Sequence, residues 1–229
     1  MRTAISRPIS VSIIAFLLLS VLYTNARAAT DIWLFYGAGP PIFSSGMNQI
    51  ARKARLVSGV GHVHGPYRYY ETQRVYDSIR SSLPSDKKVL VGYSCGGNAS
   101  LAVAQGLAQS NIPVHILAMQ PSLWCGWYLP TTSNVVYAQS TYASCIGTLG
   151  LGCMRFYGNA QENVNIFRPE GHLRADTDPA YQRDVMSAIY RIANPRGCDP
   201  RRHQCHAHTL VVHRAPGGGV SHTLVHHDQ

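Results

Sequence analysis

The sequence lacks the features that mark several large classes of protein. It has no stripe of lysines and arginines, since 20 basic and 11 acidic residues are spread along the 229-residue chain and give a formal net charge of +9. Such mild basicity argues against a nucleic-acid partner and fits solubility or attraction to an anionic surface. No two cysteines have the C-x-x-C spacing of a zinc site, and no segment repeats.

Long apolar runs are also missing, apart from one short run near the N-terminus. Residues 11–22 follow two arginines and precede the small-x-small pattern of Ala26-Arg27-Ala28. The run is shorter than the roughly 20 residues that span a bilayer, which argues against a membrane anchor. Its three-part order is typical of a secretory signal peptide. We therefore expect residues 1–28 to be removed, leaving a secreted or periplasmic chain of net charge +6 with no membrane span.

All six cysteines follow the expected cleavage site. An even number of cysteines in an exported chain indicates disulfides, although six cysteines allow many pairings and the sequence does not choose among them. The short, turn-like segment between Cys198 and Cys205 makes that pair the most favourable one.

Apolar, strand-like runs alternate with helix-like segments through residues 29–195. The expected strands are 32–36, 60–64, 89–91, 114–119, 135–138 and, as the last one, 164–167. The expected helices are 45–56, 71–82, 96–109 and a final helix from Pro179, with Asp178 as its N-cap, to about 194–195. This alternation predicts an α/β fold with a mostly parallel sheet of about five to six strands and helices on both faces.

The composition changes after Pro195. Residues 196–229 contain seven of the eleven histidines and three consecutive glycines, so we expect a flexible tail outside the folded domain. The alternative is a metal site in the tail, which would make the chain a metal-binding export factor. Its candidate ligands are His203, Cys205, His206, His208, His226 and His227.

One turn has the pattern of a nucleophilic serine. Residues 89–91 lead into Gly92-Tyr93-Ser94-Cys95-Gly96, and an alanine-rich helix follows. In this G-x-S-x-G pattern the glycines remove Cβ atoms that would collide in a tight strand-to-helix turn, and the helix N-terminus favours developing negative charge. The sequence therefore predicts Ser94 as a nucleophile, and the alternative is a glycine-rich turn with an incidental serine. Cys95 is a poorer candidate, because a G-x-C-x-G pattern would need glycine in place of Tyr93.

With this motif, residues 31–193 resemble a compact member of the α/β-hydrolase superfamily, similar to small lipases, cutinase-like esterases and thioesterases with little or no lid domain. The resemblance implies a serine hydrolase that cleaves esters or thioesters through an acyl-enzyme and needs no cofactor. It also implies an oxyanion hole formed by the backbone N–H of Cys95 and by a donor in the loop 37–39, with Ala38 as the expected residue. Tyr36 stands where many relatives have a histidine.

The family places its histidine after the last strand, and here Gly171-His172 takes that position. We therefore expect His172 to be the general base that takes the serine proton and returns it to the leaving group. The alternative is a loop histidine that packs under the final helix. The early histidines, His62, His64 and His115, lie on expected strands and should be structural or exposed.

Few acidic residues could serve as the third member of a catalytic triad, the group that orients the histidine. The family order is serine, acid, histidine, and only Glu162 and Glu170 are acidic between Ser94 and His172. Glu162 precedes its strand, at the wrong end of the sheet, and Glu170 is only two residues from His172.

The two strand ends that carry the acid in relatives have Gln120 and Gln139 instead. An amide oxygen can accept the Nδ1–H bond of the histidine and hold its tautomer, but it supplies no negative charge. We therefore expect Gln120 to complete the triad, with Glu170 or the more distant Asp176 as alternatives.

The missing acid also leaves a second function open, a non-catalytic descendant of the fold that binds a ligand or partner. For an enzyme, the expected partner is a small or lipid-like ester, and the sequence does not indicate an oligomeric state. An acyl pocket or plain surface packing would equally explain the aromatic residues Tyr67, Tyr69, Tyr70, Trp124 and Trp127.

Overall fold

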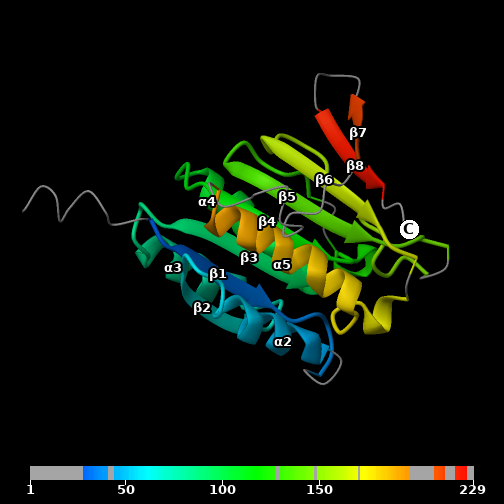
Figure 1. Ribbon diagram of the computed structural model, residues 1–229, viewed down its shortest axis with the longest axis horizontal. Helices are drawn as coiled ribbons and strands as arrows, with labels where there is room; N and C mark the ends of the chain where they lie inside the picture. Colours follow the sequence, from blue (N-terminus) through cyan, green and yellow to red (C-terminus); the bar gives the residue numbers. More distant parts are fainter. Residues whose placement is uncertain are drawn as a thin grey trace, which may run out of the picture.

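The computed structural model describes residues 28–40, 44–126, 129–146, 149–169 and 171–195, and the backbone of 209–214 and 220–225. Within this part, six neighbouring parallel strands make up most of one sheet. The whole sheet has the order β2-β1-β3-β4-β5-β6-β8-β7 (Figure 1). These six strands are β1 (Thr30–Phe35), β2 (Val60–Tyr67), β3 (Lys87–Tyr93), β4 (Val114–Met119), β5 (Val135–Tyr142) and β6 (Glu162–Phe167).

Helices cover both faces of this sheet, which confirms the expected α/β class. They are α2 (Ser45–Ala54), α3 (Thr72–Ser81), α4 (Cys95–Ala108) and α5 (Pro179–Ala193), with short 3-10 helices η2 (Leu123–Cys125) and η3 (His172–Arg174). The α2 and α5 helices pack on one face, around side chains such as Leu34 and Val91, and α3 and α4 pack on the other, around Trp33 and Leu90. Successive strand residues point to opposite faces, so a sheet buried on both faces needs strands that are apolar throughout.

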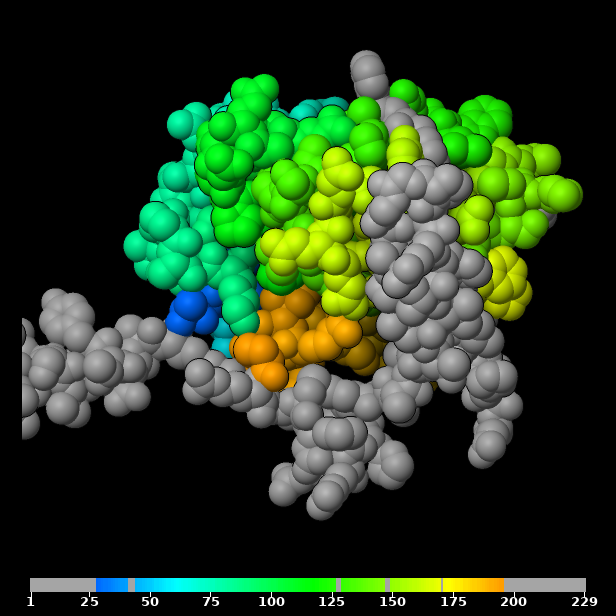
Figure 2. Space-filling model, turned by 90° about the horizontal axis from the view of Figure 1, so that it is seen from above, coloured from blue at the N-terminus to red at the C-terminus, as the bar shows by residue number. Residues whose placement is uncertain are grey.

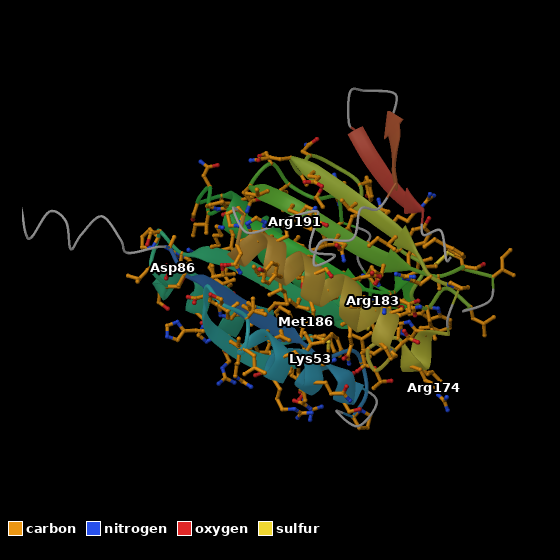
Figure 3. All side chains as sticks on the ribbon, viewed as in Figure 1. Lys53, Asp86, Arg174, Arg183, Met186 and Arg191 are labelled. Atoms are coloured by element: carbon orange, nitrogen blue, oxygen red, sulfur yellow. A yellow bond between two sulfur atoms is a disulfide. The ribbon has the colours of Figure 1, made fainter. Side chains whose placement is uncertain are left out.

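Two contacts set the position of α5. Asp178 caps the helix as expected, since its Oδ1 accepts hydrogen bonds from the N–H groups of Ala180 (2.7 Å) and Tyr181 (3.4 Å). Lys53 of α2 donates to Gln182 Oε1 at 2.6 Å and links the two helices on this face. Figure 3 shows Lys53 on α2 facing the α5 side, with Arg183, Met186 and Arg191 along α5, and Figure 2 shows α5 at the molecular surface.

Two segments of the expected tail extend the sheet. Strand β8 (Val220–Val225) pairs in parallel with β6, and β7 (Thr209–Arg214) pairs antiparallel with β8 at the edge (Figure 1). The prediction that residues 164–167 form the last strand is therefore wrong. Both segments are rich in valine and threonine, which favour strands, while the histidines within and around them indicated a tail. The rest of 196–229, with its candidate metal ligands and Cys198 and Cys205, lies outside the described residues, as do residues 1–27.

The expectation of disulfides is confirmed within the described part of the chain. Cys95 bonds Cys125, with Cα atoms 5.3 Å apart, and Cys145 bonds Cys153, with Cα atoms 4.9 Å apart. The first bridge ties the start of α4 to η2, and the second closes part of the loop that follows β5. Among the described residues, no helix is both long enough and apolar enough to cross a membrane.

Candidate functional site

Ser94 occupies a very tight turn between β3 and α4. Its φ of 54° and ψ of −123° are sparsely populated for a residue with a side chain. Both flanking glycines are required, since a Cβ on Gly92 would lie 2.2 Å from the backbone of Gly96, and a Cβ on Gly96 would lie 2.6 Å from Phe35 O. The N–H of Ser94 donates to Met119 O at 2.9 Å, which ties the turn to the end of β4.

His172 meets Ser94 at this turn. Ser94 Oγ lies 2.9 Å from His172 Nε2, and the two residues are only 6 % and 8 % exposed. His172 opens η3, after β6, and its backbone oxygen accepts a hydrogen bond from the hydroxyl of Tyr93. The rings of Tyr93 and His172 also stack, with centroids 5.2 Å apart. Strand β3 therefore supplies the residue beside Ser94 that holds the imidazole in place.

Gln120 contacts the other ring nitrogen. It follows β4 directly, has a φ of 46°, and places Oε1 2.9 Å from His172 Nδ1. Its N–H donates to Thr141 O at 2.6 Å, and the side chain is fully buried. Gly152, from the loop after β5, covers this contact so closely that a Cβ there would lie 2.5 Å from His172 Nδ1. The loop thus keeps water away from the bond between histidine and glutamine.

The electrostatic state of His172 follows from these surroundings. Burial lowers the pKa of His172 from 6.5 to about 4, so the ring is neutral at neutral pH. A neutral imidazole has one donor nitrogen and one acceptor nitrogen, and its partners decide which is which. With an amide oxygen at Nδ1, the proton belongs on Nδ1 and the lone pair of Nε2 faces the Ser94 hydroxyl.

The other candidates for the third position lie elsewhere. Gln139 was expected at the end of a strand but lies inside β5. Its Oε1 accepts a hydrogen bond from the hydroxyl of Tyr137 at 2.8 Å. Asp176 Oδ2 accepts the N–H of Gly46 at 2.8 Å, at the start of α2. Glu162 begins β6, and Glu170 lies outside the described residues. Of the expected orienting groups that the structure describes, Gln120 is the one beside His172.

The two expected oxyanion donors follow β3 and β1. Cys95 is the first residue of α4, and the first N–H groups of a helix have no acceptor within the helix itself. Ala38 is exposed and follows Gly37, whose Cβ would lie 3.0 Å from Ser94 Cβ. The N–H of Gly37 donates to Ser44 Oγ at 3.2 Å. The loop after β1 therefore reaches the serine, and Ala38 lies at its exposed end.

Two loops beside Ser94 present apolar side chains to solvent. The N–H of Leu123 donates to Gly150 O at 3.2 Å, and the indole of Trp124 donates to Leu149 O at 2.6 Å. These bonds join η2 to the loop after β5. Of the aromatic residues that could form an acyl pocket or pack on the surface, Tyr69 and Tyr70 pack edge to face on each other, and Trp127 lies outside the described residues. The exposed apolar residues on or next to these loops and η3 are Leu123, Trp124, Ile146, Leu149 and Leu173.

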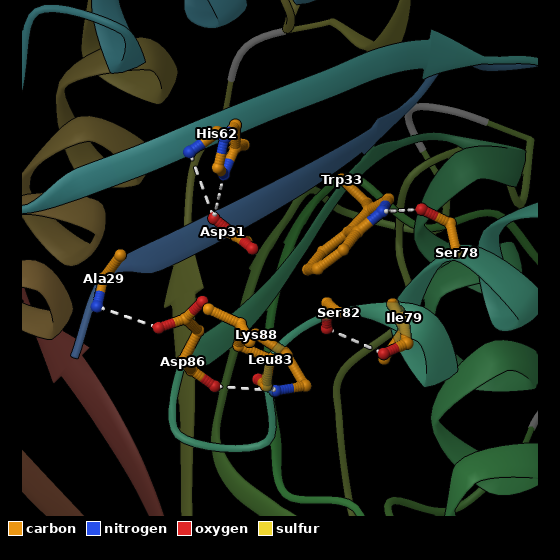
Figure 4. Close-up of polar contacts among 10 residues, drawn as sticks. All are labelled: Ala29, Asp31, Trp33, His62, Ser78, Ile79, Ser82, Leu83, Asp86 and Lys88. Atoms are coloured by element: carbon orange, nitrogen blue, oxygen red, sulfur yellow. Dashed lines mark hydrogen bonds and ion pairs between the residues drawn. The ribbon is translucent and has the colours of Figure 1, made fainter.

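A second polar cluster lies at the amino ends of the strands, away from Ser94 (Figure 4). His62 Nδ1 lies 3.1 Å from Asp31 Oδ1, and the ring of His64 stacks on Trp33 with centroids 4.8 Å apart. His115 lies on β4, and burial lowers its pKa to about 4, assisted by Lys87 and Arg191. None of these histidines contacts the serine site.

No metal centre was found, because no group of three histidine, cysteine or acidic side chains in the described part of the chain could hold an ion. No known protein family matches the chain, and no curated protein matches its sequence. The geometry around Ser94 is therefore the basis for inferring a function.

Proposed function

We propose that the protein is a compact α/β-hydrolase that cleaves carboxylic esters or thioesters through an acyl-enzyme on Ser94. One observation carries the proposal. Ser94 Oγ and His172 Nε2 are 2.9 Å apart while His172 Nδ1 and Gln120 Oε1 are also 2.9 Å apart. A hydroxyl, a base and an orienting acceptor in one line are what nucleophilic catalysis by serine requires.

In the proposed reaction, Ser94 Oγ attacks the carbonyl carbon of the substrate while its proton passes to His172 Nε2. The N–H of Cys95 and a donor in the loop after β1, with Ala38 as the candidate, hydrogen-bond the oxyanion of the tetrahedral intermediate. The intermediate collapses when His172 returns the proton to the leaving alcohol or thiol. Water then attacks the acyl-enzyme by the same route and releases the acid.

Gln120 can fulfil only one of the two roles of a triad carboxylate. Its oxygen holds the correct tautomer of His172, but it carries no charge to stabilise the imidazolium that forms during attack. We therefore expect a slower reaction than with a carboxylate. The low pKa of His172, about 4, keeps this base unprotonated under acidic conditions.

Export completes the proposal. The signal-like residues 1–28 support secretion or a periplasmic location. The disulfides Cys95–Cys125 and Cys145–Cys153 agree with it, because disulfides persist in oxidising compartments.

The same amide favours a second candidate function, a non-catalytic binding protein built on this fold. Without a carboxylate, the imidazolium that forms when His172 takes the proton lacks a compensating charge. In that case Ser94 and His172 would form part of a ligand site and would not transfer an acyl group.

A fluorophosphonate probe separates the two functions, because it reacts only with an activated serine. We expect the purified, disulfide-bonded protein to become labelled and to hydrolyse p-nitrophenyl esters, and Ser94→Ala to lose both properties. Ser100→Ala is the matched control, since Ser100 is also buried, in α4, but its hydroxyl donates to Gly96 O. Folded protein that resists the probe would contradict the hydrolase and favour the binding protein.

A further inference from the structure

The third position of the site has a property that a carboxylate lacks, namely two different ends. In the side-chain amide of Gln120 the oxygen accepts hydrogen bonds and the nitrogen donates them, although the two ends have nearly the same shape. Only the oxygen can accept the Nδ1–H of His172. If the nitrogen faced the ring, it would favour the tautomer with the proton on Nε2, and that nitrogen could not take the proton of Ser94.

We propose that Tyr181 of α5 is a positioning residue that turns the amide of Gln120 so that its oxygen faces His172. The amide nitrogen of Gln120 donates to the hydroxyl oxygen of Tyr181, and this hydroxyl in turn lies 3.4 Å from Arg168 O, to which it donates. Because the phenolic proton is directed at a carbonyl, the phenolic oxygen meets the amide as an acceptor. An acceptor on that side selects the NH₂ end of the amide and leaves Oε1 for His172.

The hydrogen bonds therefore run in one direction across the core. Donation passes from His172 Nδ1 to Gln120, from Gln120 to Tyr181, and from Tyr181 to the carbonyl of Arg168. At the other side of the ring, Ser94 meets the lone pair of Nε2. Gln120 and Tyr181 are both fully buried, so water does not compete for these groups.

Both distal members of this series are fixed to α5. Tyr181 lies in the first turn of the helix, where its N–H donates to the capping carboxylate of Asp178 at 3.4 Å. Arg168 forms a buried, two-pronged ion pair with Asp184 of the same helix, at 3.0 and 2.9 Å. A bidentate pair restrains the position of the arginine. Helix α5, which carries neither Ser94 nor His172, thus determines how the side-chain amide of Gln120 is oriented.

A double-mutant experiment tests this role of Tyr181. Its expected effect on catalysis rests on the proposed hydrolase function. In Gln120→Glu both ends of the side chain are oxygens, so no orientation has to be selected. We expect Tyr181→Phe to lower kcat at least about tenfold in the wild-type background, the equivalent of one lost hydrogen bond, with little change in KM. The same substitution in the Gln120→Glu background should have an effect of less than about twofold. Equal losses in both backgrounds would mean that the hydroxyl only stabilises the fold, and would overturn the inference.

Tyr137→Phe is the matched control. Tyr137 is also buried, and its hydroxyl also bonds a glutamine amide, donating to Gln139 Oε1 at 2.8 Å, but it has no link to His172. We expect it to leave kcat unchanged in both backgrounds.

A second readout does not depend on activity. In ¹⁵N-histidine-labelled protein at neutral pH, the ring nitrogen shifts report the tautomer of His172, which comparison with His172→Ala assigns. We expect a protonated Nδ1 in the wild type and in Tyr137→Phe, and a shift toward protonated Nε2 in Tyr181→Phe. An unchanged tautomer in Tyr181→Phe would refute the inference even in an active enzyme. The expected change in a protein that resists the fluorophosphonate would support the orienting role while contradicting the hydrolase.

Discussion

Gly152 lies against His172 so closely that a methyl group in place of its hydrogen would lie 2.5 Å from Nδ1 and 2.6 Å from the Oε1 of Gln120. The contact comes from a loop between β5 and β6 that has no regular helix or strand of its own at this point. Its backbone seals the hydrogen bond on which the tautomer of His172 depends.

Gly152→Ala should therefore separate His172 from Gln120. Its φ of 73° also disfavours any residue with a Cβ, so we expect a loss of stability of roughly 1 kcal/mol or more and a larger loss of fluorophosphonate labelling. Gly171→Ala is the control, because Gly171 also neighbours His172 but a Cβ there meets nothing within 4 Å. Labelling rates and denaturation midpoints of the two variants test this, and equal effects would contradict a specific role for Gly152.

The pH dependence of activity should show a base that stays neutral in acid. Burial lowers the pKa of His172 to about 4, and the active form is the unprotonated one. Activity should persist as the pH falls below 6.5 and disappear as it passes through about 4, which kcat/KM measured against pH reports for the free enzyme. In Gln120→Glu the added carboxylate should favour the imidazolium and move this limb to higher pH. A wild-type limb near 6.5 would contradict the burial effect.

Stability should also fall in the same pH range. His115 and His172 both have a folded-state pKa of about 4 against an ordinary value of 6.5, so the unfolded chain binds more protons between these values. Because protons then favour the unfolded state, the free energy of unfolding should decrease as the pH falls from 6.5 to 4. Chemical denaturation of the wild type and of His115→Gln over this range checks the contribution of His115. An equally steep decrease in the variant would show that His115 contributes nothing.

The two disulfides should differ in their contribution to stability. Cys95–Cys125 spans 30 residues and Cys145–Cys153 spans 8, and the entropy of loop closure gives about 3–4 and about 2–3 kcal/mol for such loops, respectively. We expect the paired serine substitutions to follow this order in guanidinium unfolding. Removal of Cys95–Cys125 should also slow fluorophosphonate labelling of Ser94, because this bridge holds η2 to the turn that carries Ser94. The reverse order of stabilities would contradict the entropic account.

The sequence predicted the central strands well for a physical reason. Their residues face apolar layers on both sides, so apolar runs mark them directly, as in β4, which spans 114–119 as expected. β5 was expected to end at Ala138 but continues to Tyr142, because Gln139, Ser140 and Thr141 are polar and yet buried. The hydroxyls of Ser140 and Thr141 donate to Met154 O and Ala118 O, far away in the sequence, which a single-sequence pattern does not reveal.

The site was predictable where position along a strand determines chemistry. Ser94, His172 and Gln120 each follow a strand, and the carboxyl ends of parallel strands lie at one edge of the sheet, so the sequence could place all three residues at that edge. The roles of Tyr181 and Gly152 could not. Tyr181 looks like any apolar position of an amphipathic helix, and Gly152 lies in a loop without periodicity.

The uncharged amide at Gln120 has a consequence for the whole molecule. A carboxylate at this fully buried position would lose its hydration on folding, at a cost of several kcal/mol that neighbouring dipoles repay only in part. An amide whose two ends both find partners loses far less. In the proposed hydrolase, the amide thus gives up part of the driving force for proton transfer and avoids burying an uncompensated charge in the core.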